Sequence, residues 1–331
     1  MRRIKVDAVL KAKSDAFCRG LFSKKDASFI SPITKLEKLR DNIPPRKHKA
    51  YRAYVQGIID SYPQIVAATP DEIDSLIISF NNILPYNKVK QNVPYKKSTF
   101  WEAVVDAMRY EDLRSTEFPV FLKSEQFKAC IYCNAQLSVV VDFTYYSKKK
   151  KKVHEHVARL ELDHYFPKSD YPFLCTSFYN LYPVCSNCNR SKSIKHAKFR
   201  LYTETNDLEV FRFWLDEDSV VKYWVSGKHE DLKVYFDHID GDIDFLKNHN
   251  ELFKIQGVYD TQTDVAEELV NKAKAYSNAY KNGLVNSLKS IFPDTALINR
   301  LLVGNYTAPE DVHKRPLAKF TQDIARQLKL I

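Results

Sequence analysis

The segment 180-NLYPVCSNCNRSK-192 restricts the fold of this sequence more than any other. It contains one Cys-x-x-Cys pair, Cys185 and Cys188, and two thiolates on such a tight turn can bind the same metal ion. Asn180 precedes the pair by five residues, and Asn189 follows it at once. A zinc-binding turn needs neither asparagine, so both residues need a separate explanation.

The remaining cysteines indicate how the metal would be held. A second pair, Cys130 and Cys133, lies upstream, and 51 residues separate the two pairs. Structural zinc takes four ligands, so the two pairs predict one four-cysteine zinc site. Six cysteines in 331 residues are too few and too clustered for a disulfide scaffold, which favours metal binding in a reducing compartment. Cys18 and Cys175 are expected to be plain thiols.

Composition limits the class of protein. With 44% hydrophobic and 13% aromatic residues the chain is expected to fold, and its 331 residues allow about two domains. Its apolar runs are far shorter than the roughly 20 residues that span a bilayer. Charged residues also interrupt the N-terminal segment. We therefore expect a mature cytoplasmic protein with no membrane partner.

The charge favours a polyanionic partner. Fifty-one Lys and Arg residues against 41 Asp and Glu residues give a net charge of +10. Basic side chains that neutralise phosphates release counterions, which favours nucleic acid as the partner. The excess is concentrated in residues 1–60, with 15 basic against 6 acidic residues, and in the run 148-KKKKK-152. A basic protein with no such partner is the alternative.

The N-terminal third has the pattern of helices. Thr69 with Glu72, and Thr99 with Glu102, have the spacing of capping boxes, and apolar residues at helical spacing follow each of them. This pattern predicts a helical region over residues 1–120.

Strands are expected after residue 121. β-branched and aromatic residues predict two strands, 136–147 and 153–162, joined by the lysine run. A loop with prolines follows, ordered structure returns at 179–185, and residues 189–199 can form a helix. Further strands are expected at 208–215 and 232–236, and helices at 264–280 and 309–331.

The excursion between the cysteine pairs contains Asp163-His164, at the end of the second predicted strand. The order Asp-His, Asn180, then Cys-x-x-Cys-Asn-x-x-Lys resembles the HNH nucleases of the ββα-metal fold, in the subtype in which zinc holds the ends of the motif. The resemblance covers about a fifth of the chain. It implies an α+β fold, with a small zinc-stapled ββα-metal HNH core in residues 121–200 and mostly helical N- and C-terminal regions, 1–120 and 201–331.

The resemblance also implies catalytic roles. His164 would be the general base that takes a proton from water, and Asn180 would orient the loop that carries it. Asp163 and Asn189 would bind one catalytic Mg²⁺ or Mn²⁺, alongside one structural Zn²⁺ on the cysteines. Asparagine at the third motif position makes this an HNN variant and favours oxygen-preferring Mg²⁺ over softer metals.

Three basic residues are candidates for nucleic-acid binding. Arg190 and Lys192, which we place on the first turn of the helix after the second cysteine pair, would contact phosphate near the positive N-terminal end of that helix. Lys168, close to His164 in the sequence, is a weaker candidate for the same contact.

These features predict a metal-dependent HNH endonuclease that cleaves nucleic acid, with DNA as the expected substrate. The chain as a whole, with 252-LFKIQGVYDTQTDVAEEL-269 after the core, loosely resembles the HNH proteins of bacterial anti-phage systems, such as the nuclease component of Septu-type systems. That resemblance implies antiviral defence and a regulatory partner such as an ATPase.

Two alternatives remain. A second Asp-His pair, Asp237-His238, has no Cys-x-x-Cys-Asn after it, and we interpret it as a coincidence. The competing function is a non-catalytic four-cysteine zinc module that binds nucleic acid or a protein partner. It is preferred if Asp163, His164 and Asn189 do not meet at one point.

Overall fold

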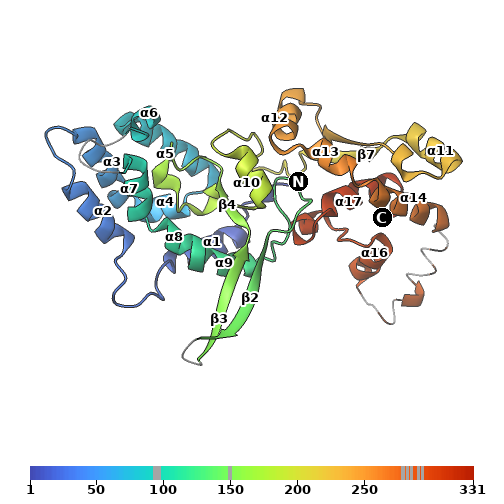
Figure 1. The fold of residues 1–331 in the computed structure, drawn as a ribbon, viewed down its shortest axis with the longest axis horizontal. Helices are drawn as coiled ribbons and strands as arrows, with labels where there is room; N and C mark the ends of the chain where they lie inside the picture. The colour runs from blue at the N-terminus through green and yellow to red at the C-terminus, as the bar shows by residue number, and fades with distance from the viewer. Residues whose placement is uncertain are drawn as a thin grey trace.

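A computed structural model describes residues 1–91, 98–147, 151–276 and 294–331, with a few further positions between 280 and 291. The N-terminal part is helical, as the sequence predicts (Figure 1). Both capping boxes form, at the starts of α5 and α7. Its helices are α1 (Ala8–Arg19), α2 (Pro32–Asp41), α3 (Lys49–Asp60), α4 (Tyr62–Ala67), α5 (Pro70–Ile83), α6 (Tyr86–Val89), α7 (Phe100–Ala107), α8 (Tyr110–Asp112) and α9 (Phe118–Ser124).

Two separate pairs of strands occupy the middle of the chain. β2 (Val139–Tyr146) and β3 (Lys152–Arg159) form the predicted antiparallel hairpin, and residues 148–150 of its lysine run lie outside the described residues. β4 (Glu161–His164) pairs antiparallel with β5 (Leu181–Val184). The predicted strand 153–162 is therefore two strands, because the chain bends at Leu160, and Asp163-His164 belongs to β4.

The helix that follows β5 is shorter than predicted. α10 (Ser186–Lys192) begins at Cys185, whose Sγ accepts a hydrogen bond from the backbone N–H of Cys188, and the helix packs against β4. The prediction of helix through residue 199 is wrong. Ser193 takes a φ of 49°, in the left-handed region that a helix cannot continue through.

The C-terminal part combines a third strand pair with helices. β7 (Phe211–Leu215) and β8 (Val234–His238) pair antiparallel, and β6 (Tyr202–Thr203) pairs parallel with β1 (Ile4–Lys5) near the N-terminus. The predicted helix 264–280 is α14 up to residue 275, and residues 277–279 lie outside the described part. The helices are α11 (Glu217–Ser226), α12 (Ile243–Phe253), α13 (Ile255–Asp260), α14 (Thr263–Ala275), α16 (Thr295–Val303) and α17 (Ala318–Gln327).

The fold is a mixture of helices and small sheets around a continuous core. One hydrophobic cluster includes residues from all three predicted regions. The C-terminal region also contacts the first cysteine pair, because Asn134 donates to Val312 O and accepts from Lys319 N–H. Contacts therefore cross the predicted boundaries near residues 120 and 200. Within the described ranges, no helix has the length and apolar character to cross a membrane.

Candidate metal centre and active site

The four paired cysteines meet in the interior. Cys130, Cys133, Cys185 and Cys188 are all buried, and their sulfur atoms lie within 4.8 Å of one another. Tetrahedral zinc with Zn–S bonds of about 2.3 Å places its sulfur ligands roughly 3.8 Å apart. The group can therefore hold one zinc ion with little movement, as the spacing of the pairs predicts.

Hydrogen bonds among the thiols separate their acidities. The pKa of the Cys185 thiol is lowered, because its sulfur is hydrogen-bonded to the thiols of Cys130, Cys133 and Cys188. The pKa of the Cys188 thiol is raised by hydrogen bonds with Cys130, Cys133 and Cys185.

The C-terminal region holds the first cysteine pair in place. His249 Nε2 donates to Tyr132 O at 2.8 Å, and the Tyr259 hydroxyl donates to Cys133 O at 2.8 Å. The ring of Phe253 stacks on that of Tyr132, with centroids 4.3 Å apart. Helices α12 and α13 therefore support the turn that carries two of the four sulfur atoms.

Asp163 is connected to this metal centre by a hydroxyl group. Tyr132 lies between Cys130 and Cys133, and its hydroxyl donates to Asp163 Oδ2 at 2.8 Å. The Asp163 side chain is only 4% exposed. Burial raises the pKa of its carboxyl, and the charge of Lys192 and the bond from Tyr132 oppose that shift. Tyr132 therefore fixes one carboxylate oxygen relative to the cysteines.

Lys192 occupies a different place from the one predicted. It is the last residue of α10, not part of its first turn, and its side chain is fully buried. Its ammonium lies 3.1 Å from Asp163 Oδ1 and 3.0 Å from Oδ2, and donates to His164 O at 2.8 Å. A direct contact of Lys192 with phosphate is therefore incompatible with this arrangement. Lys192 is the counter-ion of Asp163.

His164 ends β4 beside Asp163 and is only 7% exposed. Its Nε2 lies 3.1 Å from Cys175 O, so Nε2 carries the proton and Nδ1 keeps a lone pair. The ring of Tyr110 packs on the imidazole, with centroids 4.8 Å apart. Burial, with the positive charge of Lys168, lowers the pKa of His164 to about 3. The imidazole is therefore neutral at pH 7.

Asn180 joins both ends of the loop that follows His164. Its Oδ1 accepts from the N–H of Phe166 at 2.8 Å, and its Nδ2 donates to Phe166 O at 3.2 Å and to Leu174 O at 3.1 Å. Leu174 precedes Cys175, whose carbonyl accepts the bond from His164. The buried amide thus fixes the loop that orients the imidazole, in the position that the sequence interpretation gives it.

The other candidates lie around this group. Asn189 is half-buried and lies three residues before Lys192 on α10, so the two share a helix face toward β4. Arg190 is exposed, and its guanidinium donates to Asn187 Oδ1 at 2.9 Å. The ammonium of Lys168 lies over the Tyr110 ring, 4.6 Å from its centroid. Arg190 and Lys168 therefore have side chains that an anion could reach.

Comparison with known proteins gives no family for this chain. No family model, no curated protein and no solved structure matches it. The functional argument therefore depends on the geometry of the chain itself.

The second Asp-His pair has a structural role. His238 ends β8, and its Nδ1 accepts from the N–H groups of Asp240 and Asp242 at 3.2 and 3.3 Å. Asp237 pairs with Arg212 across the strands. These contacts fix a turn, and among the described residues only the four cysteines form a group of His, Cys, Asp and Glu ligands able to hold a metal.

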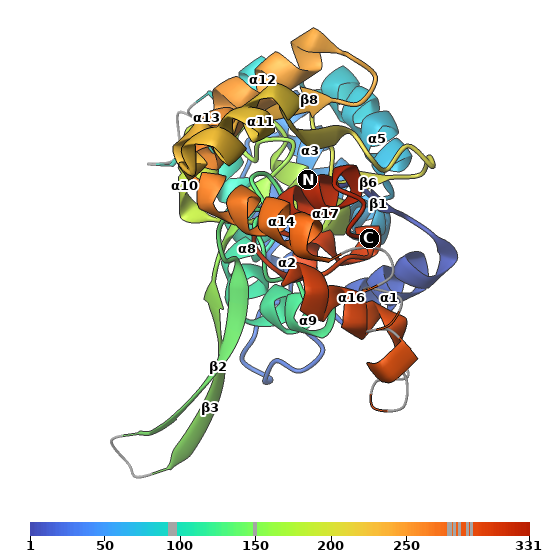
Figure 2. The same ribbon diagram turned by 90° about the vertical axis from the view of Figure 1, so that its right-hand side faces the viewer.

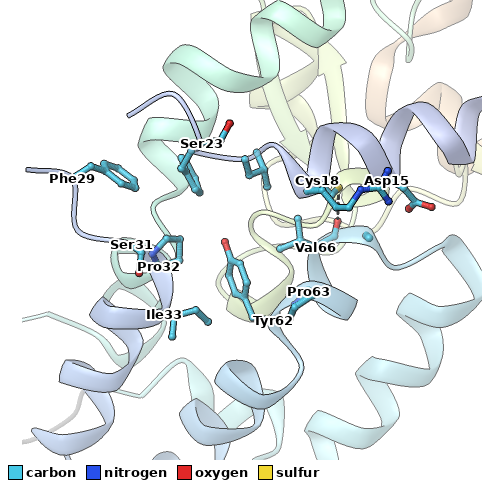
Figure 3. A pocket seen from close by; sticks show the side chains of 14 residues that line it. Asp15, Cys18, Ser23, Phe29, Ser31, Pro32, Ile33, Tyr62, Pro63 and Val66 are labelled. Atoms are coloured by element: carbon cyan, nitrogen blue, oxygen red, sulfur yellow. Dashed lines mark hydrogen bonds between the residues drawn. The ribbon is translucent and has the colours of Figure 1, made fainter. Parts of the chain in front are cut away.

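A cavity of about 540 Å³ lies in the N-terminal helical region (Figure 3). Its lining is mostly apolar and includes Cys18 from α1, Tyr62 from α4 and Phe29. None of the candidate site residues lines this cavity. Cys18 Sγ donates to Val66 O at 3.5 Å, and burial raises the pKa of its thiol to about 12. Cys18 is therefore a protonated, unreactive thiol at neutral pH.

Sequence reasoning missed two residues of the site. Tyr132 lies inside the first Cys-x-x-Cys, and a tyrosine at that position has the pattern of an ordinary aromatic core residue. Tyr110 lies more than 50 residues before His164 in the chain, and its pattern is that of an ordinary helix residue. Only the position of Tyr132 between two metal ligands was a usable signal, because it places the side chain beside the metal centre.

Proposed function

We propose that this protein is a metal-dependent HNH-type endonuclease that hydrolyses phosphodiester bonds in nucleic acid, with DNA as its substrate. The observation that carries the proposal is that Asp163 and His164 are consecutive residues at the end of β4, with the imidazole oriented by a loop that Asn180 fixes. The neutral imidazole can accept a proton from water at Nδ1. Burial is the main cause of its low pKa, so opening of the site to solvent raises that pKa and makes the imidazole a stronger base.

The donor types fit a catalytic Mg²⁺ or Mn²⁺. The carboxylate of Asp163 and the amide oxygen of Asn189 are hard ligands on adjacent elements, and such an ion would neutralise charge on the phosphate and the leaving oxygen. The ammonium of Lys192 lies against both oxygens of Asp163. Lys192 therefore competes with a metal ion for the carboxylate of Asp163.

The remaining roles belong to groups of the chain. His164 Nδ1 takes the proton of the attacking water, while Cys175 O accepts the Nε2–H bond and holds the ring in one tautomer. The ring of Tyr110 shields the imidazole from solvent. The charges of Lys168 and Arg190 attract the phosphate from the outer side of the site.

A regulatory partner is consistent with the burial of the site. Asp163 and His164 are 4% and 7% exposed, so a phosphodiester reaches them only after local opening. We propose that a partner such as an ATPase controls this opening, as a nuclease of antiviral defence would need.

The second candidate is a zinc module that binds nucleic acid or a protein partner without cleavage. The contact that favours it is the buried pair of Lys192 and Asp163, which already neutralises the carboxylate. In that case the pair would be a structural connection between α10 and β4.

Plasmid cleavage separates the two candidates. Purified protein is incubated with supercoiled plasmid and Mg²⁺ or Mn²⁺, with and without EDTA, at low salt. We expect nicked or linear products that EDTA abolishes. Protein that binds the plasmid in a mobility shift but leaves it intact with either metal would support the zinc module and reject the nuclease.

A further inference from the structure

The β2–β3 hairpin projects from the body of the molecule as an arm (Figures 1 and 2). Its base packs against α9, and from Val141 to Tyr146 every residue of β2 is exposed. Eight residues in each strand give a length of about 26 Å. Among the residues that the structure describes, this sheet has only two strands, so neither of its edges is paired there.

The two faces of the arm differ in their side chains and in the contacts that these side chains make. On one face, Thr144 bonds to His154 at 2.7 Å and Asp142 bonds to His156 at 2.8 Å. Lys123 of α9 also pairs with Asp142. The polar groups of this face are therefore occupied by each other.

The opposite face is mostly apolar and uncovered. Val141, Phe143 and Tyr145 lie on it, 38%, 54% and 37% exposed, and the residues across from them are Val157, Glu155 and Val153. The rings of Phe143 and Tyr145 stack, with centroids 5.6 Å apart. A two-stranded hairpin is at best marginally stable alone in water, so such a face indicates a binding surface.

The charge of the arm favours one kind of occupant. Residues 139–159 contain five lysines and Arg159 against two acidic residues, Asp142 and Glu155. Asp142 already pairs with Lys123, and Glu155 accepts from the Tyr145 hydroxyl at 2.8 Å. In the described part, Lys151 and Lys152 lie at the outer end, beyond the aromatic rings. Lysines beside exposed rings suit a polyanion that carries planar bases.

We propose that this arm binds a strand of nucleic acid, with bases against Phe143 and Tyr145 and phosphates near Lys151 and Lys152. The inference rests on the proposed function, because β3 leads through Leu160 directly into β4, which carries Asp163 and His164. A strand held on the arm is thereby directed to the candidate active site. The arm supplies affinity with little sequence preference, since any base can stack on an aromatic ring.

Equilibrium binding of the zinc-loaded protein without added Mg²⁺ or Mn²⁺ tests the arm without requiring cleavage. The probes are a labelled mixed-sequence single-stranded DNA and its duplex, and salt is varied. The double variant Phe143→Leu/Tyr145→Leu keeps the face apolar but removes both rings. Trp214→Leu/Tyr235→Leu is the matched control, because these residues also form an exposed aromatic pair on a two-stranded sheet, here across the two strands, and each is 38% exposed. Lys151→Glu/Lys152→Glu is compared with exposed Lys228→Glu.

We expect the ring variant to bind single-stranded DNA about tenfold or more weakly, and the duplex less affected, whereas its control binds normally. The lysine variant should lower the slope of log affinity against log salt by about one per lysine. Arm variants that bind both probes like wild type, with thermal stability unchanged, overturn the proposal and favour a protein partner on this face. If wild type binds neither probe, the proposed nuclease function fails as well.

Discussion

Replacing Lys192 with methionine tests how the candidate active site is built. Methionine keeps most of the length of the side chain and removes the ammonium, which lies 3.0 and 3.1 Å from the two oxygens of Asp163. Asp163 would then stay buried with only the Tyr132 hydroxyl and the backbone N–H of His164 as partners. Removing one partner of a buried ion pair destabilises a protein by about 3–5 kcal/mol. We expect a loss of that size in the free energy of unfolding.

The loss should depend on pH. Burial already raises the pKa of Asp163, and without the opposing charge of Lys192 that pKa rises further. A carboxyl whose pKa is raised in the folded state destabilises the fold least when it is protonated. Its cost in the free energy of unfolding therefore grows as pH rises through the folded pKa. The difference in stability between wild type and Lys192→Met should therefore be smaller at acidic pH than at neutral pH.

Metal binding gives the readout specific to the site. If Asp163 is a metal ligand, Lys192→Met removes the competing ammonium, and Mg²⁺ should raise its melting temperature more than that of wild type. A ligand at one hundred times its Kd stabilises the folded state by about 2.7 kcal/mol. Lys319→Met is the matched control, since Lys319 is 3% exposed and pairs with Asp323 and Glu209 at 2.9 and 3.0 Å.

Differential scanning calorimetry of the three zinc-loaded proteins, with and without Mg²⁺, measures both effects. We expect both variants to melt lower than wild type and Mg²⁺ to restore only Lys192→Met. Equal responses of the two variants to Mg²⁺ would refute Asp163 as a metal ligand. An unchanged melting temperature of Lys192→Met would refute the ion-pair argument itself.

Three further changes test the support of the site. Cys133→Ser should abolish stoichiometric zinc in elemental analysis and make the protein sensitive to protease, because a structural zinc site contributes directly to folding; a folded, zinc-free wild type would contradict this. Tyr132→Phe should keep one zinc but lower the free energy of unfolding by about 1–3 kcal/mol and slow cleavage, because Asp163 loses a charge-assisted hydrogen bond. Unchanged cleavage would show that this bond does not position Asp163. Asn180→Ala should cost about 2–4 kcal/mol in urea unfolding, because the N–H and the carbonyl of Phe166 lose their side-chain partner and Leu174 O keeps only the N–H of Ser177. A loss below that range would argue against a fixed loop.

Local signals in the sequence predicted the elements that local chemistry determines. Capping boxes gave the starts of α5 and α7, and the spacing of paired cysteines gave the metal cluster. The pattern of β-branched residues gave the hairpin, although the break at Leu160 has no glycine or proline to mark it. The end of α10 was missed for the same reason, because residues 189–199 contain no helix-breaking residue and Ser193 ends the helix through its backbone conformation.

Long-range contacts could not be predicted in this way. A lysine three residues after Asn189 on a short helix has the pattern of a solvated side chain, and only the packing of α10 against β4 brings it to Asp163. Tyr110 reaches His164 from a distant helix. Such contacts depend on how helices and strands pack against each other. A single sequence contains no local signal for that packing.

The central claim is that His164 is the general base of a nuclease, and its removal tests this most directly. Single-turnover cleavage of DNA in Mg²⁺ is compared for wild type, His164→Ala and His238→Ala, with zinc content and DNA affinity measured on the same samples. A positioned base contributes roughly 10²–10⁴-fold to rate. We predict a loss of that size for His164→Ala at normal zinc content and affinity, and cleavage at the wild-type rate for His238→Ala. Cleavage by His164→Ala at the wild-type rate, or loss only in His238→Ala, would contradict the account.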